Sequence, residues 1–370
     1  MKGFSFWELQ TWFNNVDYCI IGSGIVGLNC ALSLREQFPK AKIIVLDKGI
    51  LPKGASTKNA GFSCFGSISE IIADLKSHSQ QEVIDLVQKR WDGVNLLRKR
   101  LGEAAIGYQQ NGGYEVFFNE RSYEEAHNKL SMVNQMLQEV FPSAPFEVYS
   151  NKFNFENCAS NYIGSSFEGQ INTGELMKQL LFIAHSKGIQ LLYGIACNSY
   201  TQLADGVEIH TTEGDFKAAK MLIATNGFAS QMIEDDIQPA RAQVMITKPI
   251  ENFKLKGVFH MDEGYYYFRN VEDRILIGGA RNEDFKAEET TSFETTDQII
   301  NKLHKVLSEI ILPQSTYEID CQWAGIMGVG KQKGPIVKAL SNDVYCGVRL
   351  GGMGVAIGSA VGAELASLTY

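Results

Sequence analysis

The sequence contains no stretch rich in lysine and arginine, and its 34 basic residues are outnumbered by 42 acidic ones. A formal net charge of −8 disfavours polyanionic partners, so we expect no nucleic-acid surface. No hydrophobic run approaches the length that spans a membrane, and no signal peptide precedes the first predicted strand. We therefore expect no transmembrane segment and a cytoplasmic location.

Patterns typical of metal sites and disulfides are also missing. The 7 cysteines are scattered without a CxxC pair, and the 6 histidines form no HExxH spacing. This predicts neither a disulfide framework nor a bound metal. With 370 residues, 45% hydrophobic and 21% charged, the chain is long enough for two domains of an ordinary α/β protein.

The segment Asp17 to Asp47 contains the clearest motif. A hydrophobic run ends in Gly22-Ser23-Gly24-Ile25-Val26-Gly27, a helical pattern follows to Phe38, and a second hydrophobic run ends on Asp47. This order predicts a dinucleotide-binding βαβ unit with the pyrophosphate at the helix N-terminus and a ribose on Asp47. The alternative is that the glycines serve only a tight turn.

A second loop of small residues follows, from Leu51 to Gly66. It contains Ala55-Ser56-Thr57-Lys58-Asn59-Ala60-Gly61, which offers backbone groups for close approach to an extended ligand. Flavin-type folds use such a loop here and NAD-type folds usually do not. A plain connecting loop is the alternative.

The elements in the rest of the chain interrupt the nucleotide fold and predict a second domain. Gly102–Phe118 suggests a hairpin with its turn at Asn111-Gly112-Gly113, and a helix is expected over Tyr123–Val140. Alternating strands follow Pro239, and the final glycine loop precedes a helix over Val355–Leu368. The aromatic segment Met1–Val16 is expected to form a short helix packed on the body, with a partner or membrane-surface contact, or a disordered tail, as alternatives.

These motifs together resemble the superfamily of FAD enzymes that contains D-amino-acid oxidase, glycine oxidase and sarcosine oxidase. Besides the two glycine-rich segments, the marks are Asn172-Thr173-Gly174-Glu175-Leu176, Ala224-Thr225-Asn226-Gly227, Tyr267-Phe268-Arg269, Trp323-Ala324-Gly325 and Gly351-Gly352-Met353-Gly354. The preface Ser5-Phe6-Trp7-Glu8 also resembles the branch with gamma-glutamylputrescine oxidase.

The resemblance implies an α/β fold, in which a Rossmann-like FAD-binding domain is interleaved with a mostly antiparallel-sheet substrate domain. The implied FAD domain comprises residues 1–80, 157–236 and 318–370, and the substrate domain comprises 81–156 and 237–317. The residues implied to hold FAD are Gly22, Gly24, Ile25, Val26, Gly27, Asp47, Lys48, Ala55, Ser56, Asn59, Ala60, Gly61, Phe62, Cys197, Thr225, Asn226, Gly227, Trp323, Gly351, Gly352, Met353, Gly354 and Val355.

The reaction implied by the resemblance oxidises the C–N bond of a small amine or amino acid to an imine, by hydride transfer to flavin N5. The strand with Tyr265, Tyr266 and Tyr267 offers substrate residues on alternate faces, and the resemblance favours Tyr266. Packing aromatics are the alternative. A substrate carboxylate would need an arginine, supplied by Arg349, Arg269, Arg281 or Arg241.

Two positions bear on the electron acceptor and on cofactor attachment. Leu276 stands where sarcosine oxidase-like members have an oxygen-activating lysine, so the acceptor is O2 or another molecule. Cys321 stands near the position of a cysteine that binds the flavin covalently, although a structural cysteine is the simpler interpretation. A non-catalytic flavoprotein and an NAD-dependent Rossmann dehydrogenase remain the alternative functions.

Overall fold

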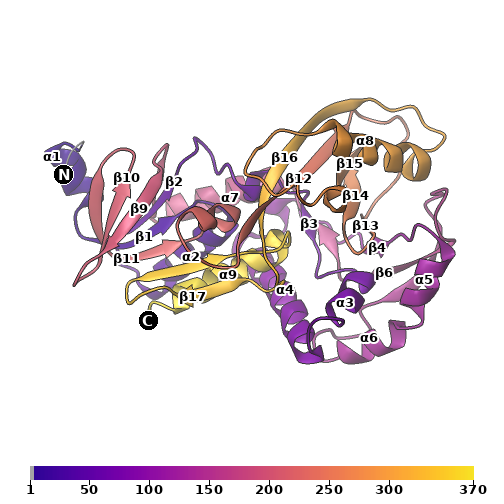
Figure 1. The fold of residues 1–370 in the computed structure, drawn as a ribbon, viewed down its shortest axis with the longest axis horizontal. Coiled ribbons are helices and arrows are strands. Elements are labelled where there is room, and N and C mark those ends of the chain that lie inside the picture. Colours follow the sequence, from indigo (N-terminus) through magenta and orange to yellow (C-terminus); the bar gives the residue numbers. More distant parts are fainter. Residues whose placement is uncertain (1–3) are drawn as a thin grey trace.

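The computed structural model describes residues 4–370, which form two lobes built on two eight-stranded sheets (Figure 1). Both ends of the described chain lie in the lobe that contains the predicted nucleotide unit. The C-terminal helix packs there beside the helix that follows the first strand. The described residues include no helix with the length and hydrophobicity needed to cross a bilayer. The mixed α/β class predicted from the sequence is confirmed.

The first sheet contains the βαβ unit. Its order is β17-β18-β11-β1-β2-β8, and β10 and β9 extend from β11. The strands from β18 to β8 run parallel, so their carboxyl ends meet at one edge, where such sheets bind ligands. The bounds are β1 Val16–Ile21, β2 Ile43–Asp47, β8 Gln190–Tyr193, β9 Cys197–Gln202, β10 Val207–Thr211, β11 Asp215–Ile223, β17 Ile336–Ala339 and β18 Val344–Val348.

The second sheet is mostly antiparallel, in the order β16-β12-β15-β14-β13-β4-β6-β5. Only β13 and β4 are parallel neighbours among its described pairs. Its strands are β4 Gly113–Glu115, β5 Glu147–Ser150, β6 Asn161–Ser165, β12 Gln238–Thr247, β13 Val258–Met261, β14 Tyr266–Val271, β15 Arg274–Gly279 and β16 Ile319–Val329. A small sheet pairs β3 (Phe62–Ser63) with β7 (Gly169–Gln170).

Helices cover both sheets. They are α1 Phe6–Glu8, α2 Ile25–Gln37, α3 Ile68–Asp74, α4 Gln80–Leu101, α5 Glu120–His127, α6 Leu130–Met136, α7 Thr173–Ser186, α8 Asp297–Val306 and α9 Gly354–Ser367. α7 begins after Asn172, whose side chain accepts a hydrogen bond from the Glu175 amide, so Asn172 caps the helix.

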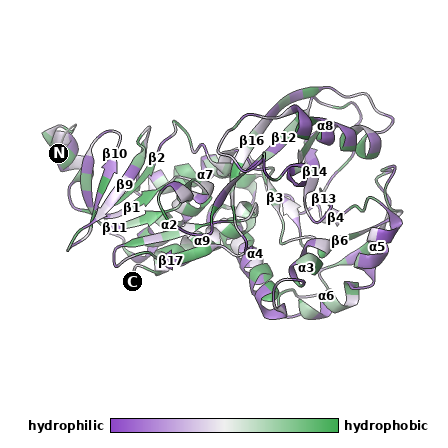
Figure 2. Cartoon of the chain, viewed as in Figure 1, coloured by the Kyte–Doolittle hydropathy of each residue, from purple (hydrophilic) through white to green (hydrophobic). Residues whose placement is uncertain are grey.

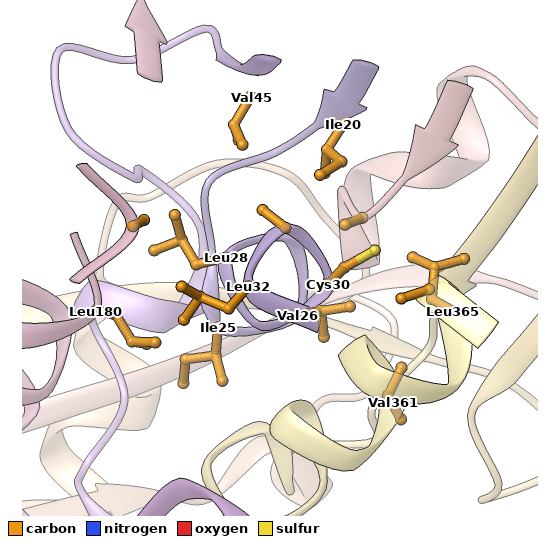
Figure 3. Close-up of a cluster of buried hydrophobic side chains, with 14 of the residues drawn as sticks. Ile20, Ile25, Val26, Leu28, Cys30, Leu32, Val45, Leu180, Val361 and Leu365 are labelled. Carbon is orange, nitrogen blue, oxygen red and sulfur yellow. The ribbon is translucent and has the colours of Figure 1, made fainter. Parts of the chain in front are cut away.

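Helix α2 lies in the centre of the first lobe, surrounded by hydrophobic side chains (Figure 3). Ile20, Val45 and Leu180 contact it from neighbouring elements, and Val361 and Leu365 approach it from α9. Figure 2 shows hydrophobic colouring concentrated around α2 and α9, whereas α5 is largely hydrophilic. Each fully buried aliphatic side chain contributes about 1.5–3 kcal/mol, so this cluster anchors the βαβ unit.

Two strands lie across the domain boundaries expected from the sequence. β6 and β16 pair within the second sheet, although the segments 157–236 and 318–370 place them in the FAD domain. Conversely, α4 is expected in the substrate domain, but it packs on α9 of the FAD domain. The two helices approach so closely that a Cβ at Gly93 would lie 2.0 Å from the Ala356 carbonyl oxygen. The domain boundaries stay a prediction.

Two local predictions were wrong. Gly102–Phe118 is no hairpin: β4 pairs with β13 and β6, which are distant in the chain. The helix expected over Tyr123–Val140 is divided into α5 and α6, and the break falls at Asn128 and Lys129. Asparagine is a weak helix former, which is consistent with a break there.

The N-terminal segment packs on the first lobe through Phe13. Its ring centroid lies 4.9 Å from that of Phe216, and Phe4 stacks on it at 4.2 Å. The expected short helix is present as α1 and the π-helical turn Leu9–Phe13. Residues 1–3 lie outside the described residues.

Candidate functional site

A cavity of about 800 Å³ extends from the carboxyl edge of the first sheet to the face of the second sheet. This volume lies in the upper part of the range for small-molecule and cofactor sites. Of the residues expected to hold a cofactor, those that line it are Gly22, Gly24, Ile25, Val26, Asp47, Lys48, Ala55, Ser56, Asn59, Ala60, Gly61, Phe62, Cys197, Thr225, Asn226, Gly351, Gly352, Met353, Gly354 and Val355. Gly27, Gly227 and Trp323 do not line it.

The glycines of the first turn are required by close backbone contacts. Gly22 has φ +105°, where a side chain is strained. A Cβ at Gly27 would lie 1.9 Å from the Gly22 carbonyl oxygen, so Gly27 lets α2 pack on the turn. A Cβ at Gly24 would lie 2.7 Å from Ser56 Oγ, so the Ser56 side chain would have to shift to admit it.

The N-terminus of α2 faces the cavity with hydrogen-bond donors. The Ile25 amide donates to Ser56 Oγ at 3.0 Å, and Val26, whose amide makes no hydrogen bond to the described chain, lines the cavity. Such amides, with the positive end of the helix dipole, bind phosphate oxygens. This donor set fits the pyrophosphate of a dinucleotide.

Asp47 lies at the end of β2 and keeps acceptor capacity. Its Oδ2 accepts from the Ser23 amide at 3.0 Å and from the Ser23 hydroxyl at 2.8 Å, and Oδ1 accepts from the Gly49 amide at 3.0 Å. A carboxylate has about four lone-pair sites. Asp47 can therefore still accept hydrogen bonds from ribose hydroxyls while its orientation is fixed.

The loop from Ala55 to Gly61 is held by side chains from elsewhere. Trp323 Nε1 donates to the Lys58 carbonyl at 2.9 Å, and Thr173 Oγ1 donates to the Asn59 carbonyl at 3.1 Å. Trp323 thus supports the cavity wall from behind. The loop presents Ala60 and Gly61 to the cavity.

The C-terminal glycine loop forms the opposite wall. Gly351 and Gly352 have φ +58° and +86°, and the Leu350 amide donates to Asn226 Oδ1 at 3.2 Å. No side chain caps α9 at its N-terminus beside Met353. The free amides there can stabilise negative charge on a bound ring system.

A row of side chains crosses the second sheet and packs against Phe62 and the loop from Ala55 to Gly61. His260 pairs with Tyr267, Tyr267 with Gly278, Gly278 with Val244, and Val244 with Trp323. Paired residues in antiparallel strands share a face. A Cβ at Gly278 would lie 2.7 Å from the Tyr267 ring, so the glycine makes room for that ring.

The prediction that Tyr266 faces the substrate has to be corrected. Its side chain lies on the opposite face of β14, where the hydroxyl donates to Glu283 Oε1 at 2.8 Å and the ring packs in the core. Tyr265 and Tyr267 line the cavity instead. Strand alternation correctly separates the tyrosines, but it does not tell which face meets the cofactor domain.

Arg349 and Arg269 also lie outside the cavity lining. Arg349 pairs with Asp236 (Nη1 to Oδ2, 2.9 Å) and donates to the Gly334 carbonyl. Arg269 donates to the main-chain carbonyls of Ala60 and Ile171. Both arginines are satisfied by the protein, so the expectation that they contact substrate is corrected.

Arg281 is the arginine best placed for an anion. It lines the cavity and stacks on Phe285, with 4.7 Å between the guanidinium carbon and the ring centroid. Within residues 4–370 its guanidinium has no hydrogen bond or ion pair, whereas Arg241 is bound to Glu288 (2.7 Å) and the cavity-lining Arg90 lies 3.3 Å from Glu70. Burial lowers the pKa of Arg281, which is the cost of a charge without a partner.

Cys321 and Leu276 do not reach the cavity. Cys321 is exposed on β16, which argues against a covalent bond to a ligand in the cavity. Leu276 is buried with Ala60 and Val244. The position expected to bear on oxygen activation is therefore occupied by a packing residue.

Several lining residues carry no motif in the sequence. Phe228, Glu70, His260 and Lys333 reach the cavity from separate elements. Lys48 lies over the Phe228 ring at 4.0 Å. Only the three-dimensional arrangement brings these residues to the same cavity, since no spacing in the chain connects them.

A comparison with known families matches residues 17–368 to the family described as FAD dependent oxidoreductase. The match spans nearly the whole chain, so the protein belongs to this family and its cofactor is FAD. The donors at α2, the acceptor Asp47 and the backbone of both glycine loops fit that cofactor. The family resemblance drawn from the motifs is confirmed, and the NAD-dependent alternative is set aside.

Relatives and solved structures agree with this assignment. Gamma-glutamylputrescine oxidoreductase of Escherichia coli (strain K12) is 21% identical over 95% of this chain and 83% of its own. Glycine oxidase of Geobacillus kaustophilus (strain HTA426) is 22% identical over 71% and 69%. The crystal structure of glycine oxidase from Geobacillus kaustophilus has a TM-score of 0.78 at 17% identity, covering 96% of this chain and 94% of its own. L-proline dehydrogenase from P. horikoshii also has a TM-score of 0.78, at 16% identity, covering 96% and 93%.

Proposed function

We propose that the protein oxidises the C–N bond of a small amine or amino acid to an imine. The observation that carries the proposal is the single cavity that joins the nucleotide-binding edge to a separate wall of Tyr265, Tyr267, His260 and Arg281. When bound, FAD supplies the hydride acceptor. The relatives named for amine and amino-acid oxidation support this choice.

In this proposal the second sheet holds and orients the substrate. Tyr267 is buried, and burial raises the pKa of its hydroxyl to about 12, so it acts as a neutral hydrogen-bonding group. Arg281 binds a carboxylate where the substrate has one, since its planar fork lacks a protein partner. Together the two side chains would present the carbon next to the nitrogen to the cofactor.

The electron acceptor is O2 or another molecule. Leu276 supplies no charge that would activate oxygen, and this favours a dehydrogenase that passes electrons elsewhere. A cytoplasmic location stays a prediction from the sequence. A flavoprotein that binds FAD without catalysis remains the alternative, and the cavity-lining guanidinium of Arg281, which has no hydrogen bond or ion pair within residues 4–370, disfavours it.

A panel of amines tests the proposal. Purified, yellow protein is mixed with glycine, sarcosine, D-amino acids, proline and polyamine derivatives, and turnover is read by hydrogen peroxide and by an artificial electron acceptor. We expect one chemical class to react, with the artificial acceptor giving the faster rate. A flavin-loaded protein that no amine reduces with either readout would favour the non-catalytic alternative.

A further inference from the structure

A buried histidine–glutamate pair borders the substrate end of the cavity. His260 on β13 lines the cavity, and no other histidine of residues 4–370 does. Its Nε2 lies 3.2 Å from Oε2 of Glu168, and the two side chains are 9% and 2% exposed. The His260 ring also packs edge-on against Phe62, with 5.4 Å between centroids. The pair is thus fixed in place at the cavity wall.

The partners of Glu168 determine which nitrogen of His260 carries a proton. Glu168 Oε1 accepts from the Phe65 amide at 3.1 Å, and this leaves Oε2 for His260. A carboxylate can only accept, so neutral His260 must carry its proton on Nε2. Nδ1 then has a free lone pair, and it makes no hydrogen bond to the described chain. Nδ1 is therefore a base without a protein partner.

The charges around the pair favour a cation. The charges of Glu70 on α3 and Glu115 on β4 act on His260, and the Sγ of Cys64, which follows β3, lies within 4.8 Å of a His260 ring nitrogen and a Glu168 carboxylate oxygen. Arg90 on α4 offsets Glu70. Burial disfavours the imidazolium, but the hydrogen bond to Glu168 and the charges of Glu168, Glu70 and Glu115 outweigh it and raise the pKa of His260.

We propose that His260, oriented by Glu168, accepts the proton of the substrate's ammonium group, a step that rests on the proposed amine oxidation. An N–H bond of the ammonium breaks and the Nδ1–H bond of His260 forms. The products are a neutral amine, whose lone pair can support loss of hydride, and an imidazolium paired with Glu168. After turnover the proton returns to water.

Such a base has a clear purpose at neutral pH. An alkyl ammonium group has a pKa of about 10, so roughly one molecule in a thousand is neutral at pH 7. A positioned proton acceptor typically contributes about 10²–10⁴-fold to a rate. At pH near 10 about half of the free amine is already neutral, so the advantage should shrink to about twofold there.

The substitution Glu168→Gln separates this role from a structural one. Its amide oxygen keeps the hydrogen bond from the Phe65 amide, so its NH₂ group must face His260 Nε2 and donate to it. This forces the proton of His260 onto Nδ1 and removes the acceptor. Glu283→Gln is the matched control, because this carboxylate bonds to Tyr266 and Lys302, lies outside the cavity lining and is not bonded to His260.

The first readout is the rate of anaerobic flavin reduction by the reactive amine as a function of pH. For Glu168→Gln we expect a fall of about 10–100-fold at pH 7 and rates within about 3-fold of wild type near pH 10. His260→Gln should behave in the same way, and Glu283→Gln should keep the wild-type profile. An equal loss at all pH values would overturn the proposal in favour of a structural role.

The second readout needs no turnover. In ¹⁵N-histidine NMR spectra, recorded at a pH where the ring is neutral and with His260 assigned by its absence in His260→Gln, we expect the Nε2–H form in wild type and the Nδ1–H form in Glu168→Gln. A wild-type Nδ1–H form would overturn the proposal. If no amine reduces the wild-type flavin, the proposed function itself is wrong. An unchanged pH profile in Glu168→Gln overturns only the role of the His260–Glu168 pair.

Discussion

Arg269 on β14 donates its Nε–H to the main-chain carbonyl of Ala60, and so a side chain of the second sheet fixes the loop that lines the FAD site. A second bond, from Nη2 to the Ile171 carbonyl at 3.1 Å, ties the same guanidinium to the segment before α7. Burial lowers the pKa of Arg269 to about 10, which still leaves it charged at neutral pH. The buried guanidinium of Arg269 therefore connects the second sheet to the loop that lines the FAD site.

Arg269→Met should loosen the cofactor loop. It leaves the carbonyls of Ala60 and Ile171 without donors, at a cost of about 1–3 kcal/mol each. We expect Tm to fall by several degrees and FAD to be lost on gel filtration. The control is Arg121→Met, since Arg121 is 88% exposed and bonds only to Glu125. Full FAD retention in Arg269→Met would contradict this role.

Gly27→Ala should prevent FAD binding. The added Cβ would lie 1.9 Å from the Gly22 carbonyl oxygen, so α2 has to move away from the turn that holds the pyrophosphate. We expect colourless or insoluble protein, checked by the flavin-to-protein absorbance ratio. Gly334→Ala is the control outside the cavity lining, because its Cβ meets nothing within 4 Å and the protein should remain yellow.

Arg281→Gln should discriminate between substrates with and without a carboxylate. Loss of a bidentate ion pair in a desolvated site should raise KM for a carboxylate-bearing substrate by about 10–100-fold. For an amine of similar size that lacks a carboxylate, KM should change less than about 3-fold. Steady-state kinetics on such a matched pair measure this, and equal effects on both substrates would exclude Arg281 as the carboxylate partner.

Tyr266→Phe and Tyr267→Phe should behave differently. Tyr266 bonds Glu283 away from the cavity, so its loss should lower stability by about 1 kcal/mol and leave KM unchanged. Tyr267 lines the cavity, and removal of its hydroxyl should alter KM or the rate of flavin reduction. If Tyr266→Phe alone changed the kinetics, the assignment of the two faces would be wrong.

The cofactor half of the site was predictable because its chemistry depends on the backbone. Close approach to phosphates needs glycine, and this need leaves a local motif from Gly22 to Gly27 that any reader of the sequence can find. The parallel strands and the acid at Asp47 follow from hydrophobic runs of the right length. These features are short-range, so no knowledge of the packing is required.

The substrate half was less predictable because it depends on which surfaces meet. Strand alternation separates Tyr266 from Tyr267, but only the packing of Phe62 against Tyr267 shows that the latter face meets the cofactor loop. Arg349 immediately precedes the final glycines, but its guanidinium forms an ion pair with Asp236, which is distant in the chain. The pairing of His260 with Glu168 has no sequence signal either, since 92 residues separate them.

The most direct test of the central claim is the anaerobic absorbance spectrum of the purified protein during addition of amines. If the protein is an FAD-dependent amine or amino-acid oxidoreductase, the oxidised-flavin band should bleach with one class of amine and recover when an electron acceptor is added. A flavin-loaded protein whose spectrum stays unchanged with every amine, while a chemical reductant bleaches it, would contradict the claim.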